Sequence, residues 1–481
     1  MAEQDPQHRR RVVVLFSLPF QGHLNPMLKL ASLLAARGLG VTVLHTDFNA
    51  PDPARHPVGL AFAPIHETLP GEATSPDSHI LTKLLVLNAA CDAPFRNTLA
   101  SLLRDHHRDD DGGDVACAVV DGQCFAAMRA AGELGVPVLA LRTDSAASFR
   151  NMLAIPRLRD AGYIPIKGKQ LGTDMSLRHL QMFVPAEEKL DLPVPGHDPL
   201  RVRDLIRVDG CDDDEHCSFV TSVADTIRSA VSGIVINTFD AVEASELAKL
   251  QNELSLPAFA VGPLHLLKFQ TPPVEQSLHE PDRGCLPWLD GHAPRSVLYV
   301  SLGSLACVDR VVFDEMAWGL AGSGVPFLWV VRPGLVITGA GDDDEAPPPL
   351  PEGFEEETRG RGRVVKWAPQ REVLAHAAIG AFWTHCGWNS TLESVCEGVP
   401  MLVQPCFADQ MVTARYVTHE WGVGMEVGEV IERGRVAEAV VKVMVGEDGA
   451  LMRERARHLK MEASAATSSA MDGLVRYILS L

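Results

Sequence analysis

The sequence predicts an α/β protein with two doubly wound parallel sheets, one in each half of the chain. The chain has 481 residues, of which 46% are hydrophobic, and this is enough for two separate cores. Short apolar runs alternate with amphipathic stretches, which is typical of strand–helix–strand units with parallel strands. A proline-rich stretch with little periodicity divides the chain near its middle. We therefore expect two domains whose sheets face across a cleft, with ligands held by loops at the carboxyl ends of strands.

The first half opens with a strand at 11–16, RVVVLF, because an apolar β-branched run is typical of a buried parallel strand. The loop that follows is expected to end at Asn25, which would cap a helix whose first residue is Pro26. Gly38 would end this helix, and a second strand is expected at 41–45. The same alternation of strand and helix returns at 115–141 and 232–250.

The domain boundaries follow from the same pattern. The first domain is expected at 1–261, a linker at 262–284 and the second domain at 285–455. An acidic, proline-rich segment at 338–353 is expected to be a surface loop. In the second domain, apolar runs typical of strands lie at 296–304, 326–334, 362–370, 379–387 and 400–410.

Composition and charge exclude several classes of partner. The formal net charge of −19 argues against binding to nucleic acid or to anionic membranes. No run approaches the roughly 18 apolar residues needed to span a bilayer, and the segment MAEQDPQHRRR lacks the apolar stretch of a signal peptide. The ten cysteines contain no C-x-x-C pair, and Cys211 and Cys217 flank an acidic run without the spacing of known metal sites. We therefore expect a cytoplasmic protein with buried thiols and no membrane or nucleic-acid partner.

The segment from His385 to Glu393 is a candidate anion site. A strand is expected to end just before His385 and a helix to begin near Gly387, so the first backbone N–H groups of the helix would face a ligand. His385, Asn389 and Ser390 would add side-chain donors. An alternative needs no ligand, because Ser390 and Glu393 have the spacing of a capping box. Walker and Rossmann glycine fingerprints are both missing, which argues against an ATPase or a dinucleotide-dependent oxidoreductase.

The 44 residues from Trp367 to Gln410 resemble the C-terminal signature box of plant UDP-dependent glycosyltransferases of family one. WAPQ, HCGWNS and the closing DQ occur in the order of that box. PFQGHLNP near the start, SVLYVSLGS and LPEGF agree with the same family, so the resemblance covers nearly the whole chain. It implies the GT-B fold, which consists of two Rossmann-like domains, with a C-terminal helix at about 456–481 packing back on the first.

The resemblance also implies where the UDP-sugar donor binds. Trp367 would stack on the uracil, the Ala368 backbone would pair with its edge, and Gln370 and Glu393 would hold the ribose. A closing Gln410 goes with UDP-glucose as the co-substrate, and no other cofactor is expected. The remaining donor residues are expected to contact the diphosphate (Ser304, His385, Gly387, Asn389 and Ser390) or the sugar (Trp388, Asp409 and Gln410).

His23 and Asp121 are the candidate catalytic residues. Asn25 and Pro26 have expected structural roles at the start of the helix, whereas His23 has no such role. An imidazole with a pKa near 6.5 suits a general base. Asp121 ends an apolar strand at the same sheet edge, where its carboxylate can hold the ring nitrogen that does not touch substrate. The resemblance implies that this pair deprotonates the acceptor for direct displacement with inversion, which gives a β-glucoside. No metal is expected, because the DDD runs lie outside the box, at 109–111, 212–214 and 342–344.

The acceptor is expected to be a lipophilic small molecule with one hydroxyl or amine nucleophile, such as a flavonoid, phenolic, hormone or terpenoid. The first half resembles the subgroup that contains cytokinin, benzoxazinoid and steviol-glycoside glucosyltransferases, and the resemblance to the family implies a monomer. Two alternatives on the same fold remain at this point: a nucleotide-dependent oxidoreductase and a non-catalytic small-molecule-binding protein. The candidate acceptor residues are Phe20, Gln21, Thr143, Asp144, Ser145 and Phe149, together with the stretch 200–206.

Overall fold

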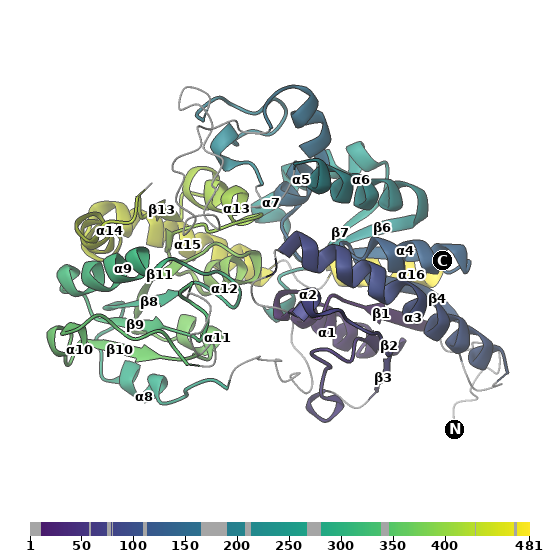
Figure 1. Cartoon of the computed structure of the whole chain (residues 1–481), viewed down its shortest axis with the longest axis horizontal. Helices are drawn as coiled ribbons and strands as arrows, with labels where there is room; N and C mark the ends of the chain where they lie inside the picture. Colours follow the sequence, from purple (N-terminus) through teal and green to yellow (C-terminus); the bar gives the residue numbers. More distant parts are fainter. Residues whose placement is uncertain are drawn as a thin grey trace. The chain divides into compact units, whose positions relative to one another are not determined.

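The chain forms two compact α/β units, each of which has its own parallel sheet (Figure 1). The first unit comprises Met1–Ala186, Val208–Gln276 and Ala466–Leu481, and the second comprises Glu187–Arg207 and Ser277–Ala465. The predicted fold class, two doubly wound parallel sheets, is confirmed. The computed structural model describes residues 11–56, 59–74, 78, 80–108, 113–164, 190–206, 213–266, 280–337, 346–428, 430–465 and 469–481.

The described residues of the first unit form a seven-stranded sheet in the order β3-β2-β1-β4-β5-β6-β7, with all neighbouring strands parallel. The strand order reverses between β1 and β4, which is where ligands bind in open α/β sheets. The strands are β1 (Val12–Phe16), β2 (Gly40–His45), β3 (Leu60–Pro64), β4 (Val115–Asp121), β5 (Val138–Arg142), β6 (Val231–Ile236) and β7 (Ala258–Ala260).

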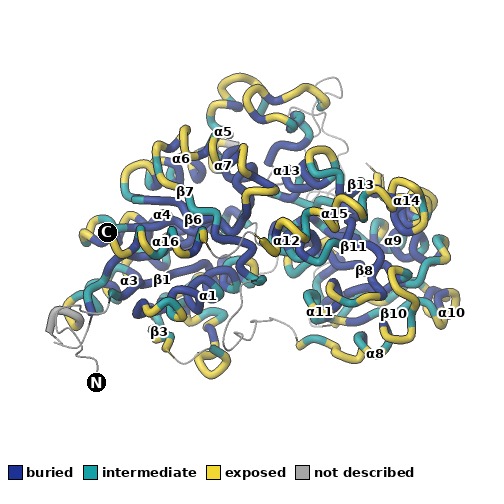
Figure 2. Tube along the Cα trace, turned by 180° about the vertical axis from the view of Figure 1, so that it is seen from behind, coloured by how far each residue is buried: buried dark blue, intermediate teal, exposed yellow. Residues whose placement is uncertain are grey.

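Helices cover both faces of this sheet, and its central strands are buried (Figure 2). Leu15 of β1 shares a core with Leu24 of α1 and Leu474 of α16, whereas Phe16 packs against Phe95 of α3 on the other face. The alternation of side chains along a strand explains why consecutive residues serve different faces. The helices are α1 (Gln21–Ala35), α2 (Gly71–Thr74), α3 (Ile80–Arg108), α4 (Phe125–Glu133), α5 (Ala146–Asp160), α6 (Asp213–Ala230), α7 (Asp240–Leu254) and α16 (Ser469–Ser480).

The described residues of the second unit form a six-stranded parallel sheet in the order β10-β9-β8-β11-β12-β13. Here the strand order reverses between β8 and β11. Trp329 of β9 and Trp383 of β11 are fully buried in the core of this unit. The strands are β8 (Val297–Ser301), β9 (Phe327–Val330), β10 (Gly362–Val365), β11 (Ile379–Thr384), β12 (Met401–Val403) and β13 (Gly424–Glu426).

The helices of the second unit include a close pair, α9 and α14. A Cβ at Gly319 of α9 would lie 2.3 Å from Cγ1 of Val436 in α14, so only glycine permits this approach. The helices are α8 (Cys285–Asp290), α9 (Arg310–Ser323), α10 (Phe354–Glu357), α11 (Gln370–Leu374), α12 (Trp388–Glu397), α13 (Gln410–Arg415), α14 (Arg433–Val445) and α15 (Glu447–Ala465).

The division of the chain differs from the predicted domain ranges in two places. The stretch at 190–206 groups with the second unit, where Arg415 Nε donates to Pro199 O at 2.9 Å and Tyr416 Oη to Asp198 O at 3.3 Å. The tail forms two helices, α15 in the second unit and α16 in the first, where the pattern predicts one. Much of the predicted linker and surface loop lies outside the described residues, as do Cys211, Asp212 and the acidic runs at 109–111 and 342–344.

The start of α1 corrects one expectation. The helix begins at Gln21, because the carbonyl of Phe20 accepts hydrogen bonds from the backbone N–H groups of His23 at 2.9 Å and Leu24 at 2.8 Å. The prediction that Asn25 caps the helix and Pro26 opens it is therefore wrong, and Pro26 lies inside the helix. A proline here removes one intrahelical hydrogen bond without ending the helix. His23 is consequently held on the first helical turn rather than in a loop.

Candidate active site

His23 and Asp121 meet where the first sheet reverses its strand order. His23 lies in the first turn of α1, which follows β1, and Asp121 is the last residue of β4, the strand next to β1. His23 Nδ1 lies 2.7 Å from Asp121 Oδ2, and the side chains are 20% and 2% exposed. The other carboxylate oxygen of Asp121 accepts the backbone N–H of Gln123 at 3.0 Å. The pair predicted from sequence is therefore in contact.

The charges of the pair stabilise one another. Burial lowers the pKa of His23, but the charge and hydrogen bond of Asp121 outweigh it, so the pKa is raised above 6.5. Burial raises the pKa of Asp121, but His23 and the backbone N–H of Gln123 outweigh it, so that pKa is lowered. Asp121 is therefore a carboxylate that holds Nδ1 as a donor, and Nε2 is the nitrogen that can accept a proton.

Two of the predicted acceptor residues lie against His23. The Oγ1 atom of Thr143 is 3.1 Å from His23 Nδ1. The ring of Phe20 meets the imidazole edge-on, with 6.3 Å between the ring centroids. Gln21 begins α1, two residues before His23. Thr143 and Phe20 therefore border the candidate base, and the acceptor role of these two residues and of Gln21 stays a prediction.

The other predicted acceptor residues have structural partners. Both carboxylate oxygens of Asp144 accept from the buried guanidinium of Arg142, at 2.9 and 2.5 Å. Ser145 is the N-cap of α5, and its Oγ accepts the backbone N–H of Ser148 at 2.9 Å. Phe149 is fully buried with the Arg142 guanidinium 4.1 Å from its ring centroid. These contacts account for Asp144, Ser145 and Phe149 without a ligand, so their acceptor role stays a prediction.

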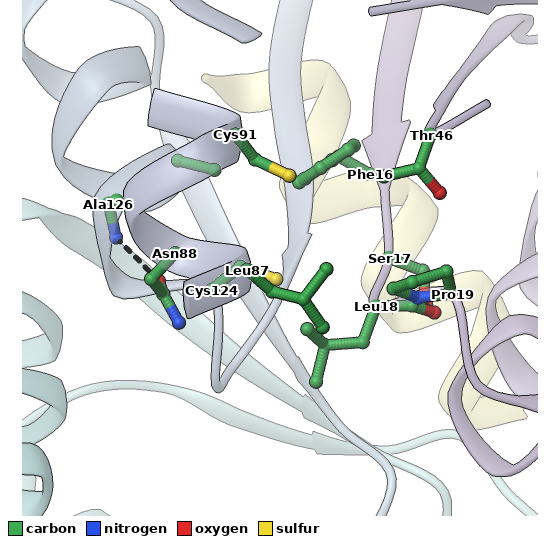
Figure 3. Close-up of a pocket in the computed structure, with 11 residues that line it drawn as sticks. Phe16, Ser17, Leu18, Pro19, Thr46, Leu87, Asn88, Cys91, Cys124 and Ala126 are labelled. Atoms are coloured by element: carbon green, nitrogen blue, oxygen red, sulfur yellow. Dashed lines mark hydrogen bonds between the residues drawn. The ribbon is translucent and has the colours of Figure 1, made fainter. Parts of the chain in front are cut away.

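A small apolar pocket lies beside the carboxyl end of β1, next to α3 and the start of α4 (Figure 3). Leu18 and Pro19, which directly precede Phe20, form one wall, and Cys91 and Cys124 lie on the wall formed by α3 and α4. Burial raises the pKa of Cys91 to about 12, so its thiol is neutral. The volume of the pocket is about 10 Å³, roughly the space that one water molecule needs. The pocket makes this side of the first unit apolar but is too small for an aglycone.

In the second unit, Ser304 and His385 also follow the two strands at which the order reverses. Ser304 follows β8, and His385 directly follows β11. A Cβ at Gly303 or Gly387 would lie 2.5 Å from atoms of the imidazole, so the ring occupies a slot that two glycines create. Burial and the charge of Arg332 lower the pKa of His385 to about 4, so the imidazole is neutral near pH 7. Its buried Nδ1 has no hydrogen-bond partner among the described residues.

The start of α12 overturns the ligand-free alternative for this segment. Gly387 is the N-cap, with no side-chain cap hydrogen bond, and the first intrahelical bond runs from Thr391 N to Gly387 O. Ser390 is therefore the third helical residue and cannot form a capping box with Glu393. Trp388 and Asn389 open the helix. The N-terminal end of α12 thus keeps the geometry and the positive dipole end that favour an anion.

Gln370, Ser390 and Glu393 form one polar cluster. Gln370 Nε2 donates to Ser390 Oγ at 3.0 Å and to Glu393 Oε2 at 2.8 Å, and Tyr299 Oη donates to Gln370 Oε1 at 3.3 Å. Residues from α11 and α12 are thereby brought together although they are 20 and 23 positions apart. The cluster offers a carboxylate beside an amide and a hydroxyl, which suits recognition of vicinal hydroxyl groups.

The remaining predicted donor residues lie in loops or at the starts of helices in the same unit. Trp367 and the buried Ala368 follow β10, and the carbonyl of Trp367 accepts the backbone N–H of Asp282 at 2.9 Å. Trp388 is buried, with its ring centroid 6.1 Å from that of Trp421. Asp409 precedes α13. Gln410 is the first residue of that helix, and its Oε1 accepts from the backbone N–H groups of 406 and 407, at 2.8 and 3.2 Å.

Two residues next to predicted donor residues, Cys386 beside His385 and Ala408 beside Asp409, have unusual backbone conformations. Cys386 has φ 65° and Ala408 has φ 57°, values that residues other than glycine seldom adopt. Such conformations cluster at functional sites, where the surrounding structure holds them in place.

In the described part of the chain, no group of three or more His, Cys, Asp or Glu side chains could hold a metal ion. No helix among the described residues is long and apolar enough to cross a membrane.

Several known proteins are similar to this chain. The sequence model of the family described as "UDP-glucoronosyl and UDP-glucosyl transferase" matches residues 283–457. DIMBOA UDP-glucosyltransferase BX8 of Zea mays is 45% identical over 460 residues, covering 94% of this chain and 94% of the relative. The chain belongs to the plant UDP-glycosyltransferase family.

Relatives of this glycosyltransferase include further plant enzymes. UDP-glycosyltransferase 76F2 of Arabidopsis thaliana is 39% identical, covering 97% of each chain. A solved UDP-glucosyltransferase from Polygonum tinctorium, capable of glucosylating indoxyl, superposes with a TM-score of 0.77 at 27% identity and covers 99% of this chain and 100% of its own. The GT-B fold is thereby confirmed. The oxidoreductase and the non-catalytic binder, left open by the sequence, are set aside.

Sequence reasoning missed two buried arginines of this glycosyltransferase, Arg142 and Arg332. Each comes at or just after the carboxyl end of a fully buried strand, β5 or β9. A single charged residue at the end of an apolar run, as in LALRTD and LWVVRPG, is the signal that could have found them. Both lie beside the candidate sites, since Arg142 and Arg332 affect the pKa values of His23 and His385 respectively.

Proposed function

We propose that this enzyme transfers glucose from UDP-glucose to a hydroxyl or amine of a lipophilic small molecule, with inversion, to give a β-glucoside. The contact between His23 and the buried carboxylate of Asp121 carries the proposal, because it supplies a general base with a fixed tautomer. His23 and Asp121 belong to the first unit, and the polar cluster and the start of α12 belong to the second. We assign the acceptor and its base to the first unit and the donor to the second.

The reaction is a single displacement. Nε2 of His23 takes the proton from the acceptor hydroxyl or amine. The oxygen or nitrogen of that group attacks C1 of glucose at the same time, on the face opposite UDP. The bond between C1 and the phosphate oxygen breaks, and its electron pair leaves with UDP. The imidazolium that forms is stabilised by Asp121, whose carboxylate accepts the hydrogen on Nδ1.

The donor assignment rests on groups that match the parts of UDP-glucose. The N-terminal end of α12, neutral His385 and Ser304 would hold the diphosphate. The oxygen of Glu393 not engaged by Gln370 would accept from the ribose hydroxyls. The indole of Trp367 would stack on uracil, as an aromatic face suits a flat heterocycle. The Gln410 oxygen already binds two backbone N–H groups, so its amide nitrogen is the group that would donate to a sugar hydroxyl.

The acceptor class follows from the surroundings of His23. Phe20 and the wall of the small pocket are apolar, and the thiols there are neutral, so a lipophilic aglycone fits better than a charged one. Two maize relatives, at 45% and 44% identity, are named DIMBOA UDP-glucosyltransferases. We therefore propose DIMBOA and related aromatic hydroxy compounds as the first acceptors to assay. We also propose that the enzyme is a cytoplasmic monomer, which light scattering and imaging of a fluorescent fusion would test.

The decisive test separates catalysis from donor binding. We expect His23→Ala to lower turnover by about 10²–10⁴-fold, the usual contribution of a general base, while the affinity for UDP stays within about twofold. Turnover is measured as UDP release with an acceptor panel that includes DIMBOA, flavonoids, cytokinins and diterpenoids, and UDP affinity by calorimetry. The anomeric configuration of the product, read by NMR, must be β.

A matched control is available in the same unit. His66 Nδ1 also lies near a carboxylate, at 3.1 Å from Asp47 Oδ2, but its side chain is 75% exposed. His66→Ala should leave both turnover and UDP affinity unchanged. A parallel loss of UDP binding and turnover in His23→Ala would contradict the division of roles between the units.

A further inference from the structure

Arg332 is a buried cation without a carboxylate partner among the described residues. It follows β9, and it is 5% exposed. Its guanidinium donates to three backbone carbonyls, Nε to Gly303 at 2.8 Å, Nη2 to Ala306 at 2.5 Å and Nη1 to Pro333 at 2.9 Å, and its one side-chain partner in the described structure is the thiol of Cys307. A buried charge is costly unless an opposite charge compensates it. Such an arrangement favours the binding of an anion nearby.

The contacts of Arg332 also orient the loop after β8. The carbonyls of Gly303 and Ala306 point to the guanidinium, and they flank Ser304. In a planar trans peptide the N–H points opposite to the carbonyl of the preceding residue. The backbone N–H of Ser304 is therefore directed away from Arg332. The loop thus presents a donor on the side that the arginine does not occupy.

The charge of Arg332 reaches the imidazole that the same loop encloses. His385 fits against Gly303, and its pKa is lowered by burial and by Arg332. His385 is therefore a neutral donor, and Arg332 supplies the fixed positive charge behind it. Since the whole chain carries a net charge of −19, a bound anion must be held by local groups of this kind.

We propose that Arg332 is a positioning residue for the diphosphate of the donor, which it stabilises by its charge and by orienting the Ser304 loop and His385. This inference rests on the proposed function, since it assumes that UDP-glucose binds in the second unit. The role goes beyond donor affinity. Negative charge grows on the leaving diphosphate as the bond to glucose breaks, so a fixed cation lowers the barrier to transfer.

The test compares ligands with and without phosphate. UDP and uridine are titrated calorimetrically into wild type, Arg332→Gln and Arg332→Lys, and the ratio of their affinities is the readout. We expect Arg332→Gln to weaken UDP binding by about tenfold or more, as expected for an interaction with a charged group, and uridine binding by less than about twofold. Arg332→Lys keeps the charge and should lie between wild type and Arg332→Gln. With UDP-glucose, kcat of Arg332→Gln should fall more than KM rises.

A merely structural role would give a different pattern. Loss of folded protein lowers the binding of both ligands alike, so the affinity ratio stays interpretable even in a destabilised preparation. Arg361 is the matched control, and it donates to Ala321 O at 2.7 Å. It precedes β10, so it lies at the amino ends of the parallel strands, whereas Arg332 lies at their carboxyl ends. Arg361→Gln should leave the ratio unchanged.

Two outcomes distinguish the inference from the function on which it rests. An unchanged UDP-to-uridine ratio in Arg332→Gln, or a lysine variant equal to the glutamine variant, would overturn the role of Arg332 alone. Failure of wild type to bind UDP would overturn the donor site itself.

Discussion

Replacing Asp121 by asparagine tests how the carboxylate supports His23. The side chain of Asp121 accepts from His23 Nδ1 at 2.7 Å and is almost fully buried, so the bond is charge-assisted and shielded from water. A hydrogen bond to a charged group contributes about 1.5–3 kcal/mol, which corresponds to about ten- to a hundredfold in rate. An amide that turns its NH₂ group to Nδ1 would also favour the proton on Nε2, the nitrogen that must accept one. We therefore expect Asp121→Asn to lower kcat by about a hundredfold or more.

The same substitution should move the pH dependence in a defined direction. The active form has a neutral imidazole, so kcat/KM rises as the pH passes the pKa of His23, which is raised above 6.5 in the wild type. Asp121 is the main group that raises this pKa, while Asp144 adds to it and Arg142 opposes it. Without the carboxylate the pKa falls, and the acid limb of kcat/KM must shift to lower pH.

The assay is UDP release from pH 5 to pH 9, with UDP affinity measured at each pH. Asp92→Asn is the control, because Asp92 forms an exposed pair with Arg129 on the outer helices of the same unit. An Asp121→Asn enzyme with wild-type turnover and an unmoved acid limb would refute the role of the pair. A fall in UDP affinity equal to the fall in turnover would also refute it.

Two further predictions concern the donor site. Gly387→Ala should weaken UDP binding, measured by calorimetry, by about tenfold, since the new Cβ would lie 2.5 Å from His385 Nε2. The control is Gly434→Ala in α14, whose new Cβ would have no atom within 4 Å, and this variant should bind UDP normally. Glu393→Gln should reduce the preference for UDP over 2′-deoxy-UDP by about tenfold, because its carboxylate is proposed to accept from the ribose hydroxyls. Competition binding measures this preference, and Glu397→Gln, which removes only a pair with Lys460, should keep it.

Much of the fold was predictable because the signals are local. Buried parallel strands such as β4 and β11 are continuous apolar runs, and the sequence shows them directly. The strands β3, β7 and β13 carry weaker signals, because they lie at the edges of the sheets and are only partly buried. The start of α1 was not predictable from the Asn25-Pro26 signature, because the extended backbone of Phe20 caps the helix without any side-chain signal.

The candidate site could be predicted only in part, for a related reason. The type of residue at a strand end is visible in the sequence, so His23, Asp121 and His385 were identifiable. Whether such a side chain is already engaged depends on partners far along the chain, and no pattern encodes them. Gln370 meets Glu393 across 23 positions, and Ser390, which has the spacing of a capping box, instead accepts from Gln370.

The two sheets have the same architecture, so the difference between their sites lies in how each balances its charge. Arg142 at the edge of the first sheet is neutralised by Asp144, and the Asp121 carboxylate is held by its hydrogen bond with His23. No uncompensated positive charge remains among these groups, so they do not favour an anion. Arg332 at the equivalent edge of the second sheet has no carboxylate partner among the described residues. An anion such as a diphosphate is therefore expected to gain more in the second unit, and this asymmetry supports the proposed assignment of donor and acceptor to the two units without reference to any relative.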